Sequence, residues 1–499
     1  MEKKPKNLWK LWTKKDVDKY QTYVTISTID STNESEGSNK RIVYMEDLEK
    51  RKKLYGICGE CNEPGTGENW CQPCNAKRFK DNFKNWTSGN KDIDELIQQS
   101  QLNAVHWSKC LEWIPFEKFR NITFIAEGGF NINLIKNHLE IHPLDIVECY
   151  GLTQNPNTNE YMMVLEYCDG GNLRNYWINS KNYKNCKSKI VKLRRVTRGL
   201  LDIHNAGFIH KDFHSGNILH AISRLFISDL GLCQPANKQA VKEEGICGVL
   251  PYVAPEILRR HQYTKAADIY SFGIIMNEFL SEEIPFNDIP HDEFLAIQIC
   301  KGHRPKISED VPKLLADLII KCWDAEIENR PTAKELYQLL KKWVDEIINI
   351  EGIYYSDDSD CSDDGDDSDD SDSENIENDS IYYSDDNDCS DDNVDDSENI
   401  ENGKNSQNSE IYFQIKEYDK IRRKKFKNRS YKDESENIQT HPQAIYTSRL
   451  LNFRNLPKPI NSSDLSSFQF NSDANYAIQS TSTNPISVQL SELELNEFW

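Results

Sequence analysis

The chain has 499 residues and a formal net charge of −21, from 81 acidic and 60 basic residues. A chain of this length has room for roughly two to four domains, and no apolar run is long enough to span a bilayer. Residues 353–403 hold 22 of the acidic residues and no Lys or Arg, which leaves 59 acidic and 60 basic residues elsewhere. The charge therefore belongs to one tail, and total charge does not favour a nucleic-acid partner.

Residues 1–54 form a basic N-terminal segment. Residues 1–15 contain Leu8, Trp9, Leu11 and Trp12 but lack the apolar stretch of a secretory signal. We expect a partly ordered tail here, with an amphipathic membrane-surface helix as the alternative. Fourteen cysteines without a secretory signal indicate a reducing compartment, the cytoplasm or the nucleus, and not a disulfide framework.

Four cysteines within residues 55–80 have the spacing of a zinc-binding module. Cys58 and Cys61 form one Cys-x-x-Cys pair, and Cys71 and Cys74 form a second pair after nine intervening residues. Two such pairs supply four thiolates, the tetrahedral ligand set that Zn²⁺ prefers. A redox pair or simple packing of thiols is the alternative, but the surrounding Gly, Pro, Asn and Glu offer no apolar core. We therefore predict a structural zinc.

Residues 81–115 follow as a helical linker. Within them, residues 91–102 place Ile93, Leu96, Ile97 and Leu102 at helical spacing. This pattern predicts a short amphipathic helix that joins the cysteine module to the next domain.

Beyond the linker, apolar patterning predicts a mixed domain. We expect strands over residues 116–125 and 161–167, helices over residues 173–177 and 188–205, and a helical lobe over residues 268–344.

Two carboxylates and a carboxamide lie close together near the centre of the chain. Residues 210–217 read His-Lys-Asp-Phe-His-Ser-Gly-Asn, which includes Asp212 and Asn217, and Asp229 follows twelve residues after the asparagine. Phosphoryl transfer needs an acidic residue that orients the attacking hydroxyl, and an Asn and a second Asp that hold Mg²⁺. The residue types of this stretch are those that the reaction requires.

Further motifs follow in the second half of the chain. They are Ala-Pro-Glu at residues 254–256, Asp-Ile-Tyr-Ser-Phe-Gly at 268–273, and Cys-Trp-Asp at 322–324 leading to Arg330. In order and approximate spacing, these motifs resemble the protein kinase family. They are also similar to the tyrosine-kinase-like group, especially its large fungal expansions. The resemblance implies a two-lobed α+β fold over residues 116–345, with ATP and Mg²⁺ as cofactors and a protein as substrate.

The resemblance also implies roles for individual residues. Asp212 corresponds to the catalytic base, and Asn217 and Asp229 to the residues that hold Mg²⁺. The backbone of Glu166 and Cys168, at the hinge between the lobes, corresponds to the adenine-binding groups. In the same way, Glu256 is expected to pair with Arg330 and brace the lower lobe.

The N-terminal lobe departs from the family pattern. Gly128 and Gly129 resemble a phosphate-covering loop, with an ordinary hairpin turn as the alternative. Only twelve residues lie between Phe130 and Pro143, where the family has two strands, a lysine and a long helix with a glutamate. At about 3.3 Å per strand residue and about 1.5 Å per helix residue, these elements do not fit into that length.

The lysine and glutamate that clamp the nucleotide phosphates in the family are therefore missing. Residues 131–141 resemble only the end of the long helix, with Leu134 in place of the glutamate. Lys136 is nearby, but we expect it to be a solvated helix residue. Without the ion pair the phosphates lose their main positive clamp. Either the chain is a pseudokinase, or it lacks a segment that its relatives contain.

Residues 229–256 contain no Ser or Thr, and Tyr252 is their only hydroxyl. Phosphorylation of Ser or Thr therefore cannot order this loop. His214 and Val249 stand where Ser/Thr kinases usually have Lys and Thr, so the class of acceptor stays open.

Residues 346–499 are expected to be a disordered tail. Ile-Tyr-Tyr-Ser-Asp-Asp at 353–358 recurs at 381–386, and such acidic repeats cannot bury enough surface to offset chain entropy. Serines in the repeat suit an acid-directed kinase, with a merely solubilising tail as the alternative. The basic run at 421–427 is either a nuclear import signal or an intramolecular partner for the repeat.

The sequence thus predicts a protein-kinase-like fold with a reduced N-lobe, a four-cysteine zinc module upstream and a disordered C-terminal tail. Its first function hypothesis is ATP-dependent phosphotransfer to Ser or Thr of a protein substrate. The second is a pseudokinase that acts as a scaffold for a protein partner, and a weaker third is a zinc-module adaptor. The sequence gives no indication of oligomeric state.

Overall fold

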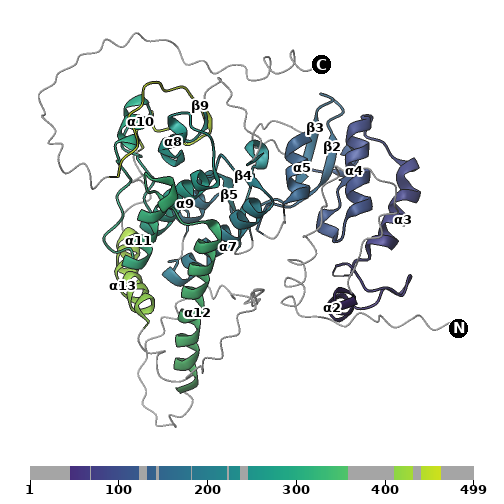
Figure 1. The fold of residues 1–499 in the computed structure, drawn as a ribbon, viewed down its shortest axis with the longest axis horizontal. Helices are drawn as coiled ribbons and strands as arrows, with labels where there is room; N and C mark the ends of the chain where they lie inside the picture. The colour runs from purple at the N-terminus through teal and green to yellow at the C-terminus, as the bar shows by residue number, and fades with distance from the viewer. Residues whose placement is uncertain are drawn as a thin grey trace, which may run out of the picture.

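The computed structural model describes residues 45–67, 69–122, 132–141, 145–180, 183–221, 224–236, 246–357, 409–430 and 440–461 (Figure 1). The segment at residues 1–15, the predicted phosphate-loop residues Gly128 and Gly129, and the acidic repeat beyond residue 357 lie outside these ranges. Among the residues described, no helix combines the length and the apolar character needed to cross a membrane.

A small three-stranded sheet belongs to the N-terminal unit of the molecule, called the upper unit below, which lies to the right of the helical lobe in Figure 1. Its order is β1 (Glu112–Trp113), β2 (Cys149–Gln154) and β3 (Tyr161–Leu165), with β1 parallel and β3 antiparallel to β2. Two helices, α4 (Lys91–Asn103) and α5 (Ile132–Glu140), contribute to the core that lies against this sheet. The predicted strand at 161–167 and helix at 91–102 are both confirmed, to within two residues.

The predicted linker is part of this upper unit. Ile93 and Ile97 of α4 are buried in one cluster with Ile135 of α5. Lys109, from the segment before β1, donates to the carbonyl of Leu139 at 2.8 Å and so closes the C-terminus of α5. Residues 81–115 therefore supply core and cap to the upper unit, and the boundary predicted at residue 116 is wrong.

The predicted strand at residues 116–125 is also wrong over its described part. Phe116–Lys118 forms a 3-10 turn, and Asn121 adopts a left-handed φ of 54° that ends extended backbone. The rings of Phe116 and Phe119 lie 6.2 Å apart, on one side of the turn. Residues three apart share a face in a 3-10 turn, whereas in a strand they point to opposite faces.

The lower lobe is helical, as expected. Its core is formed largely by α7 (Cys186–Asn205), α9 (Lys265–Ser281), α11 (Lys313–Cys322) and α12 (Ala333–Asp357), and α6 (Leu173–Ile178) lies beside it. The remaining helices and strands are α2 (Met45–Tyr55), α3 (Gln72–Asn82), β4 (Phe208–Ile209), β5 (Ile218–Ala221), β6 (Arg224–Ile227), β7 (Gln234–Pro235), β8 (Ile246–Gly248), α8 (Pro255–Leu258), α10 (Glu293–Cys300), α13 (Glu410–Ser430) and β9 (Arg449–Leu451).

A buried ion pair braces this lobe. The guanidinium of Arg330 donates to both carboxylate oxygens of Glu256, at 2.7 and 2.8 Å. The predicted pairing of these two residues is confirmed. Such bidentate geometry fixes both side chains and joins α8 to the segment before α12.

The expectation of a disordered tail from residue 346 is wrong in three places. First, α12 continues to Asp357, because Ile347 and Ile350 extend its apolar face into the core. Second, residues 410–430 form α13, which lies beside α11 on the lower lobe (Figure 1). Third, residues 440–461 contain β9, which pairs with β8.

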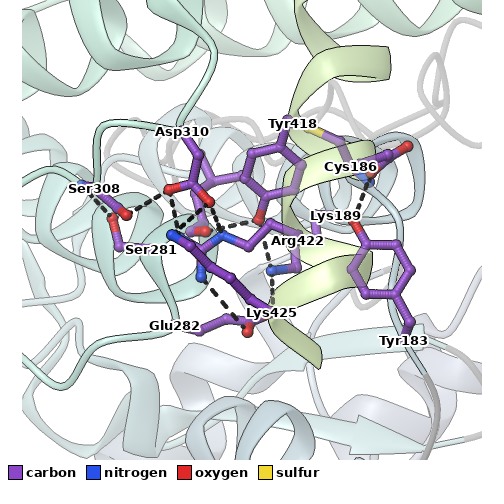
Figure 2. Close-up of polar contacts among 12 residues, drawn as sticks. Tyr183, Cys186, Lys189, Ser281, Glu282, Ser308, Asp310, Tyr418, Arg422 and Lys425 are labelled. Carbon is purple, nitrogen blue, oxygen red and sulfur yellow. Dashed lines mark hydrogen bonds and ion pairs between the residues drawn. The ribbon is translucent and has the colours of Figure 1, made fainter. Parts of the chain in front are cut away.

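The docking of α13 follows from helical spacing that the high charge of the tail conceals. Ile411, Ile415 and Tyr418 are buried and recur every three to four residues, so they form one apolar stripe. Arg422 continues the stripe, and its Nε lies 2.5 Å from Asp310. Figure 2 shows Arg422 and Lys425 directed from α13 toward Asp310. The basic run at 421–427 therefore does have an intramolecular partner, which is the helical lobe.

We expect Arg422→Ala to destabilise the lower lobe by about 3 kcal/mol, because it removes the buried cation of Asp310 and leaves that buried carboxylate only the exposed ammonium of Lys425. The side chains of Arg422 and Asp310 are 7% and 3% exposed. Thermal unfolding of the full chain measures the effect. Lys424→Ala is the matched control, since Lys424 is exposed on the same helix. Equal melting temperatures for the two variants would contradict the docking of α13.

Candidate active site and metal centre

The four cysteines predicted to bind zinc lie together. Their Sγ atoms are all within 4.8 Å of one another, with 3.8 Å between Cys58 and Cys74 and 3.6 Å between Cys61 and Cys71. A tetrahedral Zn²⁺ with bonds of about 2.3 Å places its sulfur ligands about 3.8 Å apart. A disulfide would need about 2.05 Å. The cluster thus has the size and donor set of a zinc site.

Local backbone geometry brings the cysteine pairs together. Asn62, just after Cys61, takes a left-handed φ of 61°, and the amide of Cys58 donates to Glu63 at 2.8 Å. Cys71 is the N-cap of α3, and Cys74 lies in its first turn. A helix N-terminus stabilises nearby thiolate, which is the form that binds metal.

We expect the purified full chain to carry about one zinc and to lose structure around residues 55–82 when a chelator removes it. Cys58→Ser should lower the zinc content, as measured by elemental analysis, and Cys110→Ser should not, because Cys110 lies outside the cluster. The zinc assignment would be contradicted if Cys58→Ser had the same zinc content as the native chain, or if the native chain contained no zinc.

The loop at residues 210–217 is held by one buried carboxylate. Asp268, in the first turn of α9, accepts hydrogen bonds from the backbone amides of His210 at 2.8 Å and Lys211 at 3.0 Å. Its Oδ2 also lies 2.9 Å from Nε2 of His204. Lys211 has a left-handed φ of 72°, so these bonds hold a backbone conformation that a non-glycine residue rarely adopts. The sequence showed the motif that contains Asp268 but not this role.

Asp212 and Asn217 are fixed within that loop. The side-chain amide of Asn217 donates to the carbonyl of Asp212 at 2.9 Å. The Asp212 carboxylate is buried, with its Oδ2 3.7 Å from Nε2 of His214. Burial raises the pKa of Asp212, but the hydrogen bond and charge of His214 outweigh burial and hold the pKa below its ordinary value. Asp212 is therefore anionic near neutral pH and able to accept a proton.

A short hairpin brings Asp229 to the same place. Strands β5 and β6 pair antiparallel, with Ile218 opposite Ile227, so the residues just before β5 and just after β6 are neighbours. Asn217 precedes β5, and its carbonyl accepts from the amide of Ser228 at 2.8 Å. Asp229 comes next, with a left-handed φ of 55° and a hydrogen bond from the Gly231 amide at 3.2 Å. The structure therefore brings the three predicted residues together.

The predicted hinge lies beside β3. The amide of Glu166 donates to the carbonyl of Glu148 at 2.9 Å, and Cys168 is buried in a small cluster with Val147, Ala221 and Phe226. Burial, and then the charge of Glu166, raise the pKa of Glu148 to about 7. Leu165 and Tyr167 on either side are 42% and 74% exposed. The predicted hinge thus lies against a small buried apolar cluster, while the large side chains of Leu165 and Tyr167 are exposed to solvent.

The helix α5 is tied to the start of residues 229–256, which are called the activation segment below. The side-chain amide of Asn137 is buried and donates to the carbonyls of Leu230 and Cys233, at 3.1 and 3.2 Å. Leu134 packs against the main core, and Lys136 is exposed, as expected for a solvated helix residue. Sequence reasoning missed Asn137, although a polar residue on the apolar side of a short helix was a usable signal.

Comparison with known proteins matches the same region. Residues 133–340 match the family model described as protein tyrosine and serine/threonine kinase. These matches, with the relatives below, support a protein kinase domain. The predicted assignment to the tyrosine-kinase-like group and its fungal expansions stays a prediction.

Three similar proteins are named as kinases. A probable serine/threonine-protein kinase of Dictyostelium discoideum is 30% identical over 211 residues, which is 40% of this chain and 15% of that protein. The serine/threonine/tyrosine-protein kinase HT1 of Arabidopsis thaliana is 29% identical over 40% of this chain and 51% of its own length. The serine/threonine-protein kinase VIK of the same plant is 31% identical, over 36% and 43%. The chain thus spans about half or less of these relatives.

Proposed function

We propose that the chain is a slow protein kinase that transfers the γ-phosphoryl group of ATP to Ser or Thr. The observation that carries the proposal is the fixed arrangement of Asp212, Asn217 and Asp229 described above. An anionic Asp212 at the mouth of the loop is suited to orient an acceptor hydroxyl and take its proton. Asp268 holds the backbone of His210 and Lys211, the two residues before Asp212, and so positions the loop before substrate binds.

Asn217 and Asp229 would hold Mg²⁺. Both offer hard oxygen ligands, and the pairing of β5 with β6 places them side by side. When bound, the metal neutralises charge on the transferred phosphoryl group. The remaining tasks, to position the acceptor hydroxyl and to receive its proton, would then fall to Asp212.

Because the lysine that would clamp the phosphates is missing, we expect a low rate of phosphoryl transfer. Nine of the twelve residues between Phe130 and Pro143 form α5. On this helix Leu134 packs against the main core, and Lys136 is exposed. Kinases turn over at about 1–100 per second. Loss of the main positive clamp on the phosphates should lower this rate by at least about 10³-fold, since charge stabilisation supplies most of the catalysis.

A non-catalytic scaffold is the second candidate, favoured by the same missing clamp and by the exposed Leu165 and Tyr167. In that case the helical lobe would bind a protein partner without turnover. Both proposals place the chain in a reducing compartment, the cytoplasm or the nucleus. Both also include a structural zinc.

Asp212→Asn tests the proposal, because it keeps the size of the side chain but removes the base. With Mg²⁺ and labelled ATP, we expect the full chain to label casein or itself slowly, and Asp212→Asn to label at least about 10²-fold more slowly. Asp92→Asn is a control that alters an exposed carboxylate on α4. If hours of incubation with millimolar ATP produce no labelling that depends on Asp212, the result would favour the scaffold.

A further inference from the structure

Residues 440–461 lie as an extended segment along the lower lobe. The amide of His441 donates to the carbonyl of Asn287 at 2.7 Å, and the amide of His291 donates to that of Gln443 at 2.9 Å. Farther along, the amide of Ile460 donates to the carbonyl of Cys300 at 3.0 Å. Backbone contacts at both ends fix the course of the segment across the catalytic face.

In the middle of this course the segment pairs with the activation segment. Strand β9 is antiparallel to β8, with Leu451 opposite Ile246 and Arg449 opposite Gly248. Gly248 is close to the catalytic base, since a Cβ atom placed on it would lie 3.8 Å from Oδ1 of Asp212. The residue just before Arg449 therefore arrives next to Asp212.

That residue is Ser448. Its hydroxyl lies close enough to the carboxylate of Asp212 to help hold the pKa of that carboxyl below its ordinary value, and the residue itself is exposed to solvent. A hydroxyl beside a catalytic base is positioned to pass its proton to that base when the acceptor reacts.

The residues on both sides of Ser448 are anchored. The hydroxyl of Tyr446 donates to the carbonyl of Pro285 at 2.7 Å, and the Arg174 guanidinium lies 4.1 Å from the centre of its ring. On the other side, Leu451 is buried in the main core with Ile246. Thr447 and Ser448 lie exposed between these anchors, which hold the segment in register at the catalytic base.

The docked helix α13 keeps this segment on the same molecule. Lys189, buried in α7, donates to the hydroxyl of Tyr418 at 2.9 Å, and that hydroxyl donates to the carbonyl of Leu280 at 2.7 Å (Figure 2). Only residues 431–439 connect α13 to the segment. A tether this short gives the acceptor an effective concentration of the order of millimolar.

We propose that Ser448 is a phosphorylation site of this chain's own active site, and that residues 445–451 occupy the place of a protein substrate. The proposal rests on the phosphotransfer proposed above. Oγ of Ser448 forms a bond to the γ-phosphorus of ATP as the bond from that phosphorus to the bridging oxygen breaks. ADP leaves with the electron pair, and the hydroxyl proton passes to Asp212.

Phosphorylation would also release the segment. The product carries a charge of about −1.5 to −2 beside the Asp212 carboxylate, and like charges at this distance repel. Transfer to Ser448 therefore opens the acceptor site to other proteins. A slow enzyme is sufficient for such a step, because the acceptor is always present.

Mass spectrometry of the full chain after incubation with Mg²⁺ and ATP tests the proposal. We expect phosphate on Ser448, at a first-order rate that is unchanged over a tenfold range of protein concentration. Asp212→Asn and Ser448→Ala should each remove this phosphate. Thr447→Ala should retain the phosphate. Thr447 carries the neighbouring exposed hydroxyl, so this variant distinguishes modification of Ser448 from modification of Thr447.

Casein in the same reaction separates the two proposals. If casein is labelled and Ser448 is not, or if the rate on Ser448 rises in proportion to protein concentration, transfer in cis is overturned while the kinase proposal stands. If neither casein nor Ser448 is labelled by the native chain, the kinase proposal fails, together with the inference that rests on it.

Discussion

The buried carboxylate of Asp268 is the interaction on which the catalytic face depends. It accepts the backbone amides of His210 and Lys211, the second of which is held in a left-handed conformation. The loop leads directly to Asp212, whose own carbonyl then fixes Asn217. The hairpin of β5 and β6 brings Asp229 to the same point. A single side chain from α9 thus holds the backbone of the loop that carries Asp212 and Asn217.

The two halves of the kinase-like domain differ in how many features of the family pattern they contain. The lower half has its loop, its hairpin and the buried pair of Glu256 and Arg330. The upper half is completed by residues from outside the usual domain, with α4 in its core and Asn137 joining α5 to the activation segment. These contacts supply packing, whereas the lysine and glutamate of the family pattern are missing from the sequence between Phe130 and Pro143. An acceptor tethered on the same chain offsets weak catalysis through its high effective concentration.

The sequence predicted the features that depend on local spacing. The cysteine pairs, the helix at 91–102 and the residues around Asp212 were all visible in this way, and the structure brings each set together. The strand at 116–125 failed because Asn121 turns the backbone, which apolar content does not reveal. The glycine loop lies outside the described residues.

The tail was misread for two physical reasons. Its mean charge masked the stripe of Ile411, Ile415 and Tyr418, although that spacing is helical and could have been found in a shorter window. The pairing of β9 with β8 joins residues about 200 positions apart, and no local pattern specifies the partner of a three-residue strand. Contacts of such range are where reasoning from one sequence is weakest.

Amide hydrogen exchange at residues 246–248 measures whether β9 of the tail pairs with the activation segment beside Asp212. Leu451 is 2% exposed and Leu450 is 63% exposed on the same strand, so they form a matched pair. We predict that Leu451→Asp speeds exchange at these amides by at least about tenfold, because local opening then costs about 1.4 kcal/mol less. Leu450→Asp should leave it unchanged. Equal exchange in the native chain and in Leu451→Asp would mean that β8 and β9 are not paired, and would contradict the account.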